Sequence, residues 1–205
     1  MNEIIFLFKG LIIGLAIAAS IGPISIICIQ RTLTKGRAIG LFSGLGAATA
    51  DGFYGAVASF GLTAISTFLL NYKLFISLIG GIFLIYLGIK TFFAPITKKT
   101  EQKIINQTNS YLSILLLTLA NPMTILLFMA IFAGLGLGNT NGNYFSAIMS
   151  TLGVFLGSII WYFILVEIIY FFSPKISTTT FEWINKSAGL LIGGFGMFAI
   201  IKLIV

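Results

Sequence analysis

The chain has 205 residues, of which 58% are hydrophobic and only 8% are charged. Soluble domains carry roughly 25% charged residues, so this composition excludes an ordinary water-soluble protein. The net charge of +7 does not indicate a nucleic-acid partner, because the basic residues stand singly or in pairs between apolar runs. With no histidine and one cysteine, Cys28, we expect no transition-metal site, no cofactor and no dithiol redox carrier.

Long apolar runs predict an all-α polytopic membrane protein. A helix needs about 20 apolar residues to cross the ~30 Å hydrocarbon core of a bilayer, and it satisfies its own backbone groups there. Six runs fit this description: 4–29, 38–66, 72–93, 111–137, 144–172 and 181–204. Although Ala16-Ile17-Ala18 resembles a signal-peptidase site, the first run is too long for a signal peptide, and we expect it to remain as the first helix.

Basic residues are concentrated in alternate connections between these runs. The connections after the first, third and fifth runs hold or adjoin Arg31, Lys35, Arg37, Lys90, Lys98, Lys99, Lys103, Lys175 and Lys186. The opposite side receives only Lys9, Lys73 and Lys202. Because cytoplasmic connections carry the excess of lysine and arginine, we expect these three connections in the cytoplasm and both termini outside. The predicted location is the cytoplasmic (inner) cell membrane, crossed several times.

A polar stretch at 98–110 divides the single transmembrane domain, 1–205, into halves at 1–97 and 111–205. The halves carry matching marks in the same order: Gly22-Pro23 and Asn121-Pro122; Gly40, Gly44, Gly46 and Gly153, Gly157; Gly81, Gly88 and Gly189, Gly196. Since three helices per half is an odd number, the halves would insert in opposite orientations. This predicts two inverted three-helix repeats with a binding site between them. The alternative is chance, because glycine is common in membrane helices.

The two proline sites predict breaks in their spans. Proline cannot continue a helix but suits its first position, with glycine or asparagine before it as a cap. Pro23 and Pro122 therefore each predict the start of a half-helix. Its unpaired N–H groups and partial positive charge favour an anion such as a carboxylate. The alternative is a proline kink that only shapes packing. The candidate substrate-binding residues here are Gly22, Pro23, Ser25, Asn121, Pro122 and Thr124.

Asp51 lies near the centre of the second run, where an ionised side chain costs several kcal/mol. Its neighbours at helical spacing are all small: Gly44, Ala47, Ala48, Gly55 and Ala58. Such a face can pack closely on another helix or line a narrow cavity. We predict that Asp51 takes part in transport, by binding the substrate or by taking up and releasing a proton. A structural carboxylate paired with a buried polar group is the alternative.

Glu167 is a second candidate for proton coupling. It lies five residues from the predicted end of the fifth run, so it also suits a place at the membrane interface. The aromatic residues Trp161, Tyr162 and Trp183 are interpreted as packing or interfacial side chains rather than as ligand contacts.

In this order the motifs resemble those of the LysE/RhtB family of amino-acid exporters, over essentially the whole chain. The first motif runs from Gly22-Pro23 through Lys35-Gly36-Arg37 and the glycine-rich stretch 40–47 to Asp51-Gly52. The second is Leu119-Ala120-Asn121-Pro122-Met123-Thr124. The chain departs from the family at Ile21, where many members have proline, and at Met123, where many have lysine. These departures leave the substrate open.

The resemblance implies a translocator that exports amino acids or close derivatives from the cytoplasm, driven by the membrane potential or the proton gradient. We therefore predict a secondary exporter that works by alternating access, and not an enzyme. The chain has no P-loop motif. The alternatives are export of another small solute, such as a cation or organic metabolite, and a non-transporting membrane assembly subunit. The expected partners are a small-molecule substrate and the lipid bilayer. Small-residue faces such as that of Gly81 and Gly88 suit packing within one chain or in a homo-oligomer.

Overall fold

The computed structural model describes an all-helical chain. The residues it describes are 2–20, 22–60, 72–93, 106–121, 124, 127–128, 144–173 and 178–204. The all-α prediction is confirmed over this part of the chain. Predictions that concern Pro122, most of the central polar stretch, and the ends of the second and fourth runs lie outside the described residues.

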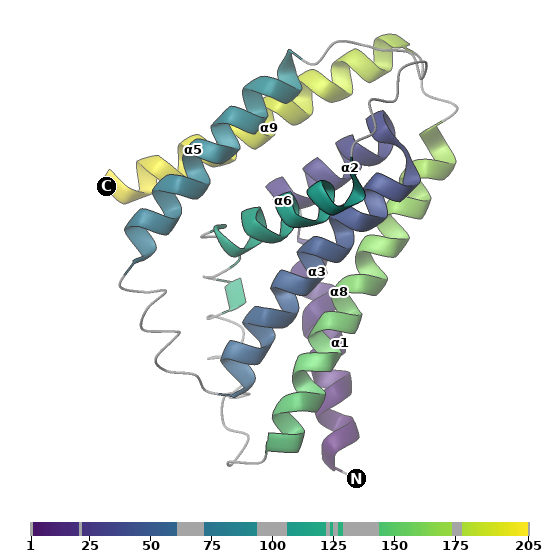
Figure 1. The fold of residues 1–205 in the computed structure, drawn as a ribbon, viewed down its shortest axis with the longest axis vertical. Helices are drawn as coiled ribbons and strands as arrows, with labels where there is room; N and C mark the ends of the chain where they lie inside the picture. The colour runs from purple at the N-terminus through teal and green to yellow at the C-terminus, as the bar shows by residue number, and fades with distance from the viewer. Residues whose placement is uncertain are drawn as a thin grey trace.

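Seven helices account for most of these residues (Figure 1). They are α1 (Asn2–Ala19), α2 (Pro23–Lys35), α3 (Arg37–Ser59), α5 (Lys73–Phe92), α6 (Gln107–Leu119), α8 (Tyr144–Phe172) and α9 (Thr178–Ile204). The first predicted run thus forms two helices, α1 and α2. Helix α6 begins inside the predicted central loop, because the Asn106 side chain accepts a hydrogen bond from the Thr108 N–H at 3.3 Å and caps it. Residues 107–110 are therefore helical, which corrects the end of that loop.

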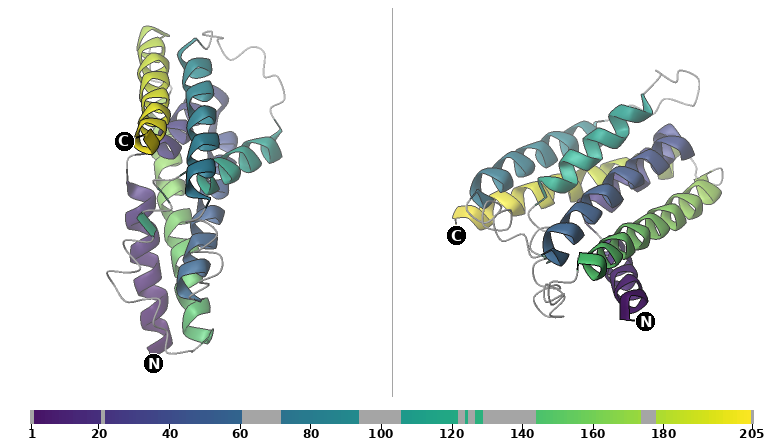
Figure 2. Two further views of the ribbon diagram at one scale, coloured as in Figure 1. Left: turned by 90° about the vertical axis from the view of Figure 1, so that its left-hand side faces the viewer. Right: turned by 60° about the horizontal axis from the view of Figure 1, so that its bottom comes forward.

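Helices α3 and α8 lie side by side at the centre, with α1 against α8 and α6 against α3 (Figures 1 and 2). Glycine sets the close approach of α1 to α8. A Cβ added at Gly10 would meet the backbone of Ser150, and one at Gly14 would meet the backbone of Val154. Residue numbers at the contacts increase in the same direction along both helices, so α1 and α8 run parallel. Helices α3 and α8 run antiparallel, since Gly44 faces Tyr162 and Gly55 faces Val154.

Helices α5 and α9 form a second, antiparallel pair (Figure 2). Their contact is made by the two glycine pairs that the sequence spaces seven residues apart. A Cβ at Gly81 would lie 3.1 Å from the Gly196 carbonyl oxygen, and one at Gly88 would lie 2.8 Å from that of Gly189. The face of Gly81 and Gly88 is therefore used for packing within the chain.

Replacing Gly153 by alanine should destabilise the protein, because the added Cβ would collide with the backbone carbonyl of Leu7 in α1. Overpacking of this kind costs about 1–3 kcal/mol. Thermal unfolding in detergent, followed by the monomer peak in size-exclusion chromatography, measures the loss. Gly194→Ala is the matched control: nothing lies within 4 Å of its added Cβ, so stability should hold or rise. Equal melting temperatures for the two variants would contradict the close packing of α1 on α8.

The outer surface of the fold is apolar, unlike that of a soluble protein. Buried side chains include Ser43, Asp51, Thr118, Asn121 and Ser158, all 5% exposed or less. Large apolar side chains instead cover the outer faces of α5, α8 and α9, among them Phe75, Ile79, Leu152, Phe163, Leu190 and Phe198. Apolar surface of this extent is stable against hydrocarbon and unstable against water.

Length and hydropathy identify few complete spans among the described residues. Helix α8 alone is long and apolar enough to cross a membrane, with a mean hydropathy of 2.3 over its best window. The α1–α2 segment, from Ile4 to Lys35, meets the same criteria when its two helices are taken together. The number of six spans therefore stays a prediction.

Several of the described basic residues, among them Arg31, Lys35 and Arg37, lie at helix ends on one side of the molecule. The ends of α2, α5 and α8 and the starts of α3, α6 and α9 all lie toward the same end (Figure 1). An ion pair joins Arg37 at the start of α3 to Glu167 near the end of α8, with 2.6 Å between Nε and Oε1. Arg31 of α2 donates to the Ser110 carbonyl of α6 at 3.0 Å. The three connections that were predicted to be cytoplasmic thus leave and enter helices at one end.

A cysteine at Lys35 should resist impermeant thiol reagents in intact cells, because the basic end is expected in the cytoplasm. The background is Cys28→Ser, and the native thiol is fully buried. Tyr144, which begins α8 and is 76% exposed, gives the positive control, since Tyr144→Cys should react from outside. Reaction at Lys35→Cys but not at Tyr144→Cys would reverse the orientation.

Candidate functional site

The first predicted half-helix start is confirmed. Helix α1 ends at Ala19, and α2 begins at Pro23 with its axis turned by 72°. Gly22 caps α2 in an extended conformation, with φ −131° and ψ 179°, and its carbonyl accepts the first helical bond from the Ile26 N–H at 3.2 Å. No side chain caps this helix. Because Pro23 has no N–H, the N–H groups of Ile24 and Ser25 are those of the first turn that lack an intrahelical acceptor.

A second break follows α6. This helix ends at Leu119, and the Asn121 N–H bonds back to the Thr118 carbonyl at 3.1 Å in a tighter turn. Helical conformation is described again at Thr124. The break confirms that the fourth predicted run is interrupted at Asn121. The half-helix start at Pro122 lies outside the described residues.

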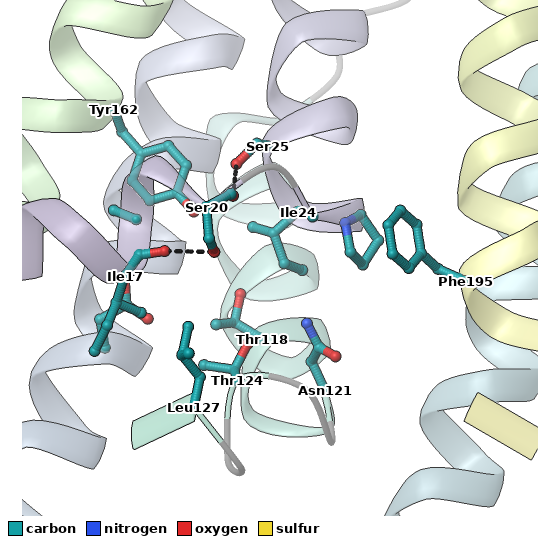
Figure 3. A pocket seen from close by; sticks show the side chains of 14 residues that line it. Ile17, Ser20, Ile24, Ser25, Thr118, Asn121, Thr124, Leu127, Tyr162 and Phe195 are labelled. Atoms are coloured by element: carbon teal, nitrogen blue, oxygen red, sulfur yellow. Dashed lines mark hydrogen bonds between the residues drawn. The ribbon is translucent and has the colours of Figure 1, made fainter. Parts of the chain in front are cut away.

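Both breaks open onto one cavity of about 220 Å³. Of the residues predicted to contact the substrate, all those that the structure describes line it: Gly22, Pro23, Ser25, Asp51, Asn121 and Thr124. Figure 3 shows Ser25 on one side of the cavity, with Asn121 and Thr124 facing it from the α6 side. Residues from both halves of the sequence therefore meet here. Their role in binding stays a prediction.

Asp51 reaches the cavity from the centre of α3 and is only 3% exposed. The small face of α3 makes this placement possible, because Gly44 and Gly52 let the side chains of α8 approach closely. Ser158 of α8 donates a hydrogen bond to Asp51 Oδ2 at 2.9 Å. The same hydroxyl lies 3.3 Å from the carbonyl oxygen of Gly14 in α1. Asp51 thus has a polar partner on the neighbouring helix, as the structural alternative also expected.

Tyr162 corrects an interpretation from the sequence. It was taken as a packing or interfacial aromatic, but it lines the cavity and is 5% exposed. It lies on the wall of the same cavity as Ser25 and Asp51. Ser158 and Tyr162 are four residues apart on a largely apolar helix, a spacing that would have placed two polar groups on one face. The remaining wall residues that the sequence did not single out are Ile17, Ala18, Ser20, Ile24, Thr118, Leu127 and Phe195.

Two charged residues lie apart from the cavity wall. Glu167 pairs with Arg37 and keeps its side chain one-third exposed, so the structure does not bring it to Asp51. The Arg31 guanidinium donates hydrogen bonds to the Ser43 and Ser113 hydroxyls, at 3.1 and 2.9 Å, and to the Ser110 carbonyl. Arg31 therefore ties α2 to α3 and α6 at the basic end of the molecule.

Comparison with known proteins places the chain among membrane transporters. It is similar to the "Putative amino acid efflux protein YcgF" of Bacillus subtilis (strain 168), with 26% identity over 92% of this chain and 91% of that protein. It is also similar to the "Uncharacterized membrane protein YahN" of Escherichia coli (strain K12), with 28% identity over 85% of this chain and 78% of that protein. The "Uncharacterized membrane protein YrhP" of Bacillus subtilis (strain 168) is 26% identical over 86% and 89%. No solved structure matches the chain.

The family model for LysE type translocators matches residues 15–203, which include both helix breaks, Asp51 and every residue of the cavity wall. The resemblance that the motifs indicated is thereby confirmed, and with it a membrane location and a role in transport. The chain belongs to the LysE type translocator family.

Proposed function

We propose that this protein is a secondary exporter that moves amino acids or close derivatives out of the cytoplasm, across the cell membrane. The observation that carries the proposal is the convergence of two helix breaks and a buried carboxylate on one cavity. An amino acid presents one carboxylate and one ammonium group at a fixed separation. The cavity offers N–H groups at the start of α2 for the first, and Asp51 for the second or for a proton.

Alternating access would follow from two inverted repeats. Exchanging the halves carries α1 to α6, α3 to α8 and α5 to α9. The packing is consistent with this exchange: α1 packs against α8, and their counterparts α6 and α3 pack against each other in the same way. A Cβ at Gly157 would meet the backbone of Leu11, and one at Gly46 would meet that of Tyr111. This correspondence supports the repeat, with the cavity at the interface between the two halves, where inverted-repeat transporters bind their substrates.

Ser158 suits a carboxyl group that gains and loses a proton. When Asp51 is ionised, the Ser158 hydroxyl can donate to it, as the 2.9 Å contact allows. When Asp51 is protonated, it can donate to Ser158, and the hydroxyl can turn to the Gly14 carbonyl, 3.3 Å away. Both states are then hydrogen-bonded without a cation, which supports coupling of export to the proton gradient or the membrane potential.

Inside-out vesicles that contain the protein test the proposal. An imposed proton gradient, acidic inside, should drive accumulation of amino acids from a labelled equimolar mixture, and a protonophore together with valinomycin and potassium should abolish it. Vesicles without the protein give the background. No accumulation above background, with correctly inserted protein, would reject amino-acid export. The same vesicles would then be tested with small cations and organic metabolites, and failure of these too would leave the assembly-subunit alternative.

A further inference from the structure

The charges around the cavity restrict its substrate. Among the described wall residues, Asp51 is the one acid, and none is lysine or arginine. The segment 122–143, which contributes Thr124 and Leu127 to the wall, contains no charged residue at all. The site can therefore match the ammonium group of an amino acid, but it holds no second acid for a basic side chain and no cation for an acidic one.

The structure places two of the other acidic residues away from the cavity wall. Glu167 is paired with Arg37 at the basic end. Glu182 is exposed near the start of α9. The last two acids, Glu3 and Glu101, lie near the amino terminus and in the central polar stretch of the sequence. A basic substrate side chain in this cavity would thus be desolvated without a partner, which is strongly unfavourable.

Part of the cavity wall is apolar. The side chains of Ile17, Ile24, Leu127 and Phe195 line it together with the polar group formed by Ser25, Asp51, Thr118, Asn121, Thr124 and Tyr162. Phe195 and Ile24 approach from one side, and Leu127 from another (Figure 3). The volume of about 220 Å³ is below the roughly 300–1,000 Å³ of sites for drug-sized ligands. It suits a single small molecule with one apolar and one zwitterionic end.

We propose that the substrate is a neutral amino acid with an uncharged aliphatic side chain of about the size of valine, leucine or methionine. The inference rests on the proposed function, since it names the substrate class of the same cavity. The zwitterion occupies the polar part of the wall, and the aliphatic side chain lies against Ile24, Leu127 and Phe195. Dibasic and acidic amino acids are rejected because their extra charge would be buried unpaired.

Counterflow in liposomes tests the substrate class. Purified protein is reconstituted, the liposomes are loaded with unlabelled leucine, and entry of labelled leucine is measured against external competitors. Valine, isoleucine and methionine should compete at concentrations similar to that of leucine. Lysine and glutamate should require roughly a hundredfold more, because an unpaired buried charge is so costly. Tryptophan should also compete weakly, because it exceeds the cavity.

A pair of variants adds a gain of function. Leu127→Asp places a second carboxylate on the wall and should let lysine compete at least about tenfold better than in the wild type. Leu127→Asn has nearly the same shape without the charge and should not. Wild-type competition by lysine or glutamate at leucine-like concentrations would overturn the neutral-substrate inference and leave amino-acid export standing. Absence of counterflow with every amino acid would overturn the proposed function itself. The wild-type profile decides even where Leu127→Asp does not fold.

Discussion

Asp51→Asn should reduce transport by roughly a hundredfold or more, the effect of about 3 kcal/mol on a buried charge interaction. The asparagine keeps the shape of the side chain and can still bond to Ser158, the donor to Asp51 at 2.9 Å. It cannot carry a negative charge toward an ammonium group, and it cannot take up a proton. Initial rates of labelled amino-acid accumulation in inside-out vesicles measure the loss, normalised to the amount of inserted protein.

Two further variants of carboxylate residues serve as controls for Asp51→Asn. Glu167→Gln removes an acid that is outside the cavity and paired with Arg37 near the surface. An exposed ion pair contributes about 0–1 kcal/mol, so this variant should transport at close to the wild-type rate. Asp51→Glu keeps the charge but adds a methylene to a face of small residues, and an intermediate rate is expected. Full transport by Asp51→Asn would exclude both proton coupling and amine binding at this position. Loss of transport in Glu167→Gln would support a role of Glu167 in proton coupling.

The parts of the site that were predicted from the sequence are those fixed by local chemistry. A proline after glycine determines that a helix begins at Pro23, whatever surrounds it. The angle of the turn, 72°, was not predicted, because the direction of α2 depends on its contacts with α3, α8 and α9. Asp51 was identified because burying a lone acid in an apolar run costs several kcal/mol, so its presence there indicates a function. Its place on the cavity wall, in contrast, depends on which helix packs on its face.

Tyr162 was missed for a related reason. Along an apolar run, a tyrosine that faces lipid and one that faces a cavity belong to the same pattern, since apolar residues occur on every side of α8. The position becomes distinctive only in three dimensions, where Gly44 of α3 leaves room for it: a Cβ there would lie 2.6 Å from the Tyr162 Cβ. The glycine pairs of α5 and α9 were predicted only in part. Their equal spacing was visible in the sequence, but it suggested a relation between halves, and the structure adds that the two pairs contact each other.

The second large effect concerns recognition of the substrate carboxylate at the two helix breaks. For the wild type, leucine should compete at least about a hundredfold better than 3-methylbutylamine, the same molecule without its carboxylate. Two hydrogen bonds to a charged group, at about 1.5 kcal/mol each, are enough for this ratio. In Asn121→Ala the ratio should fall to roughly ten, because Asn121 lines the cavity and is predicted to cap the half-helix whose N–H groups bind the carboxylate. Counterflow competition curves for both compounds on both proteins give the four values.

A matched control separates this loss from simple destabilisation. Asn106 also caps a helix, since its side chain accepts from the Thr108 N–H at the start of α6, and it is not among the wall residues of the cavity. Asn106→Ala removes a cap that is worth about 0.5–2 kcal/mol, the same order as that expected for the cap predicted at Asn121. Only the cap at Asn121 should change the ratio between amino acid and amine. If the two alanine variants lower overall transport alike and keep the wild-type ratio, the breaks serve packing alone, and recognition of the carboxylate must be assigned to the hydroxyl groups of the wall, beginning with Ser25, Thr124 and Tyr162.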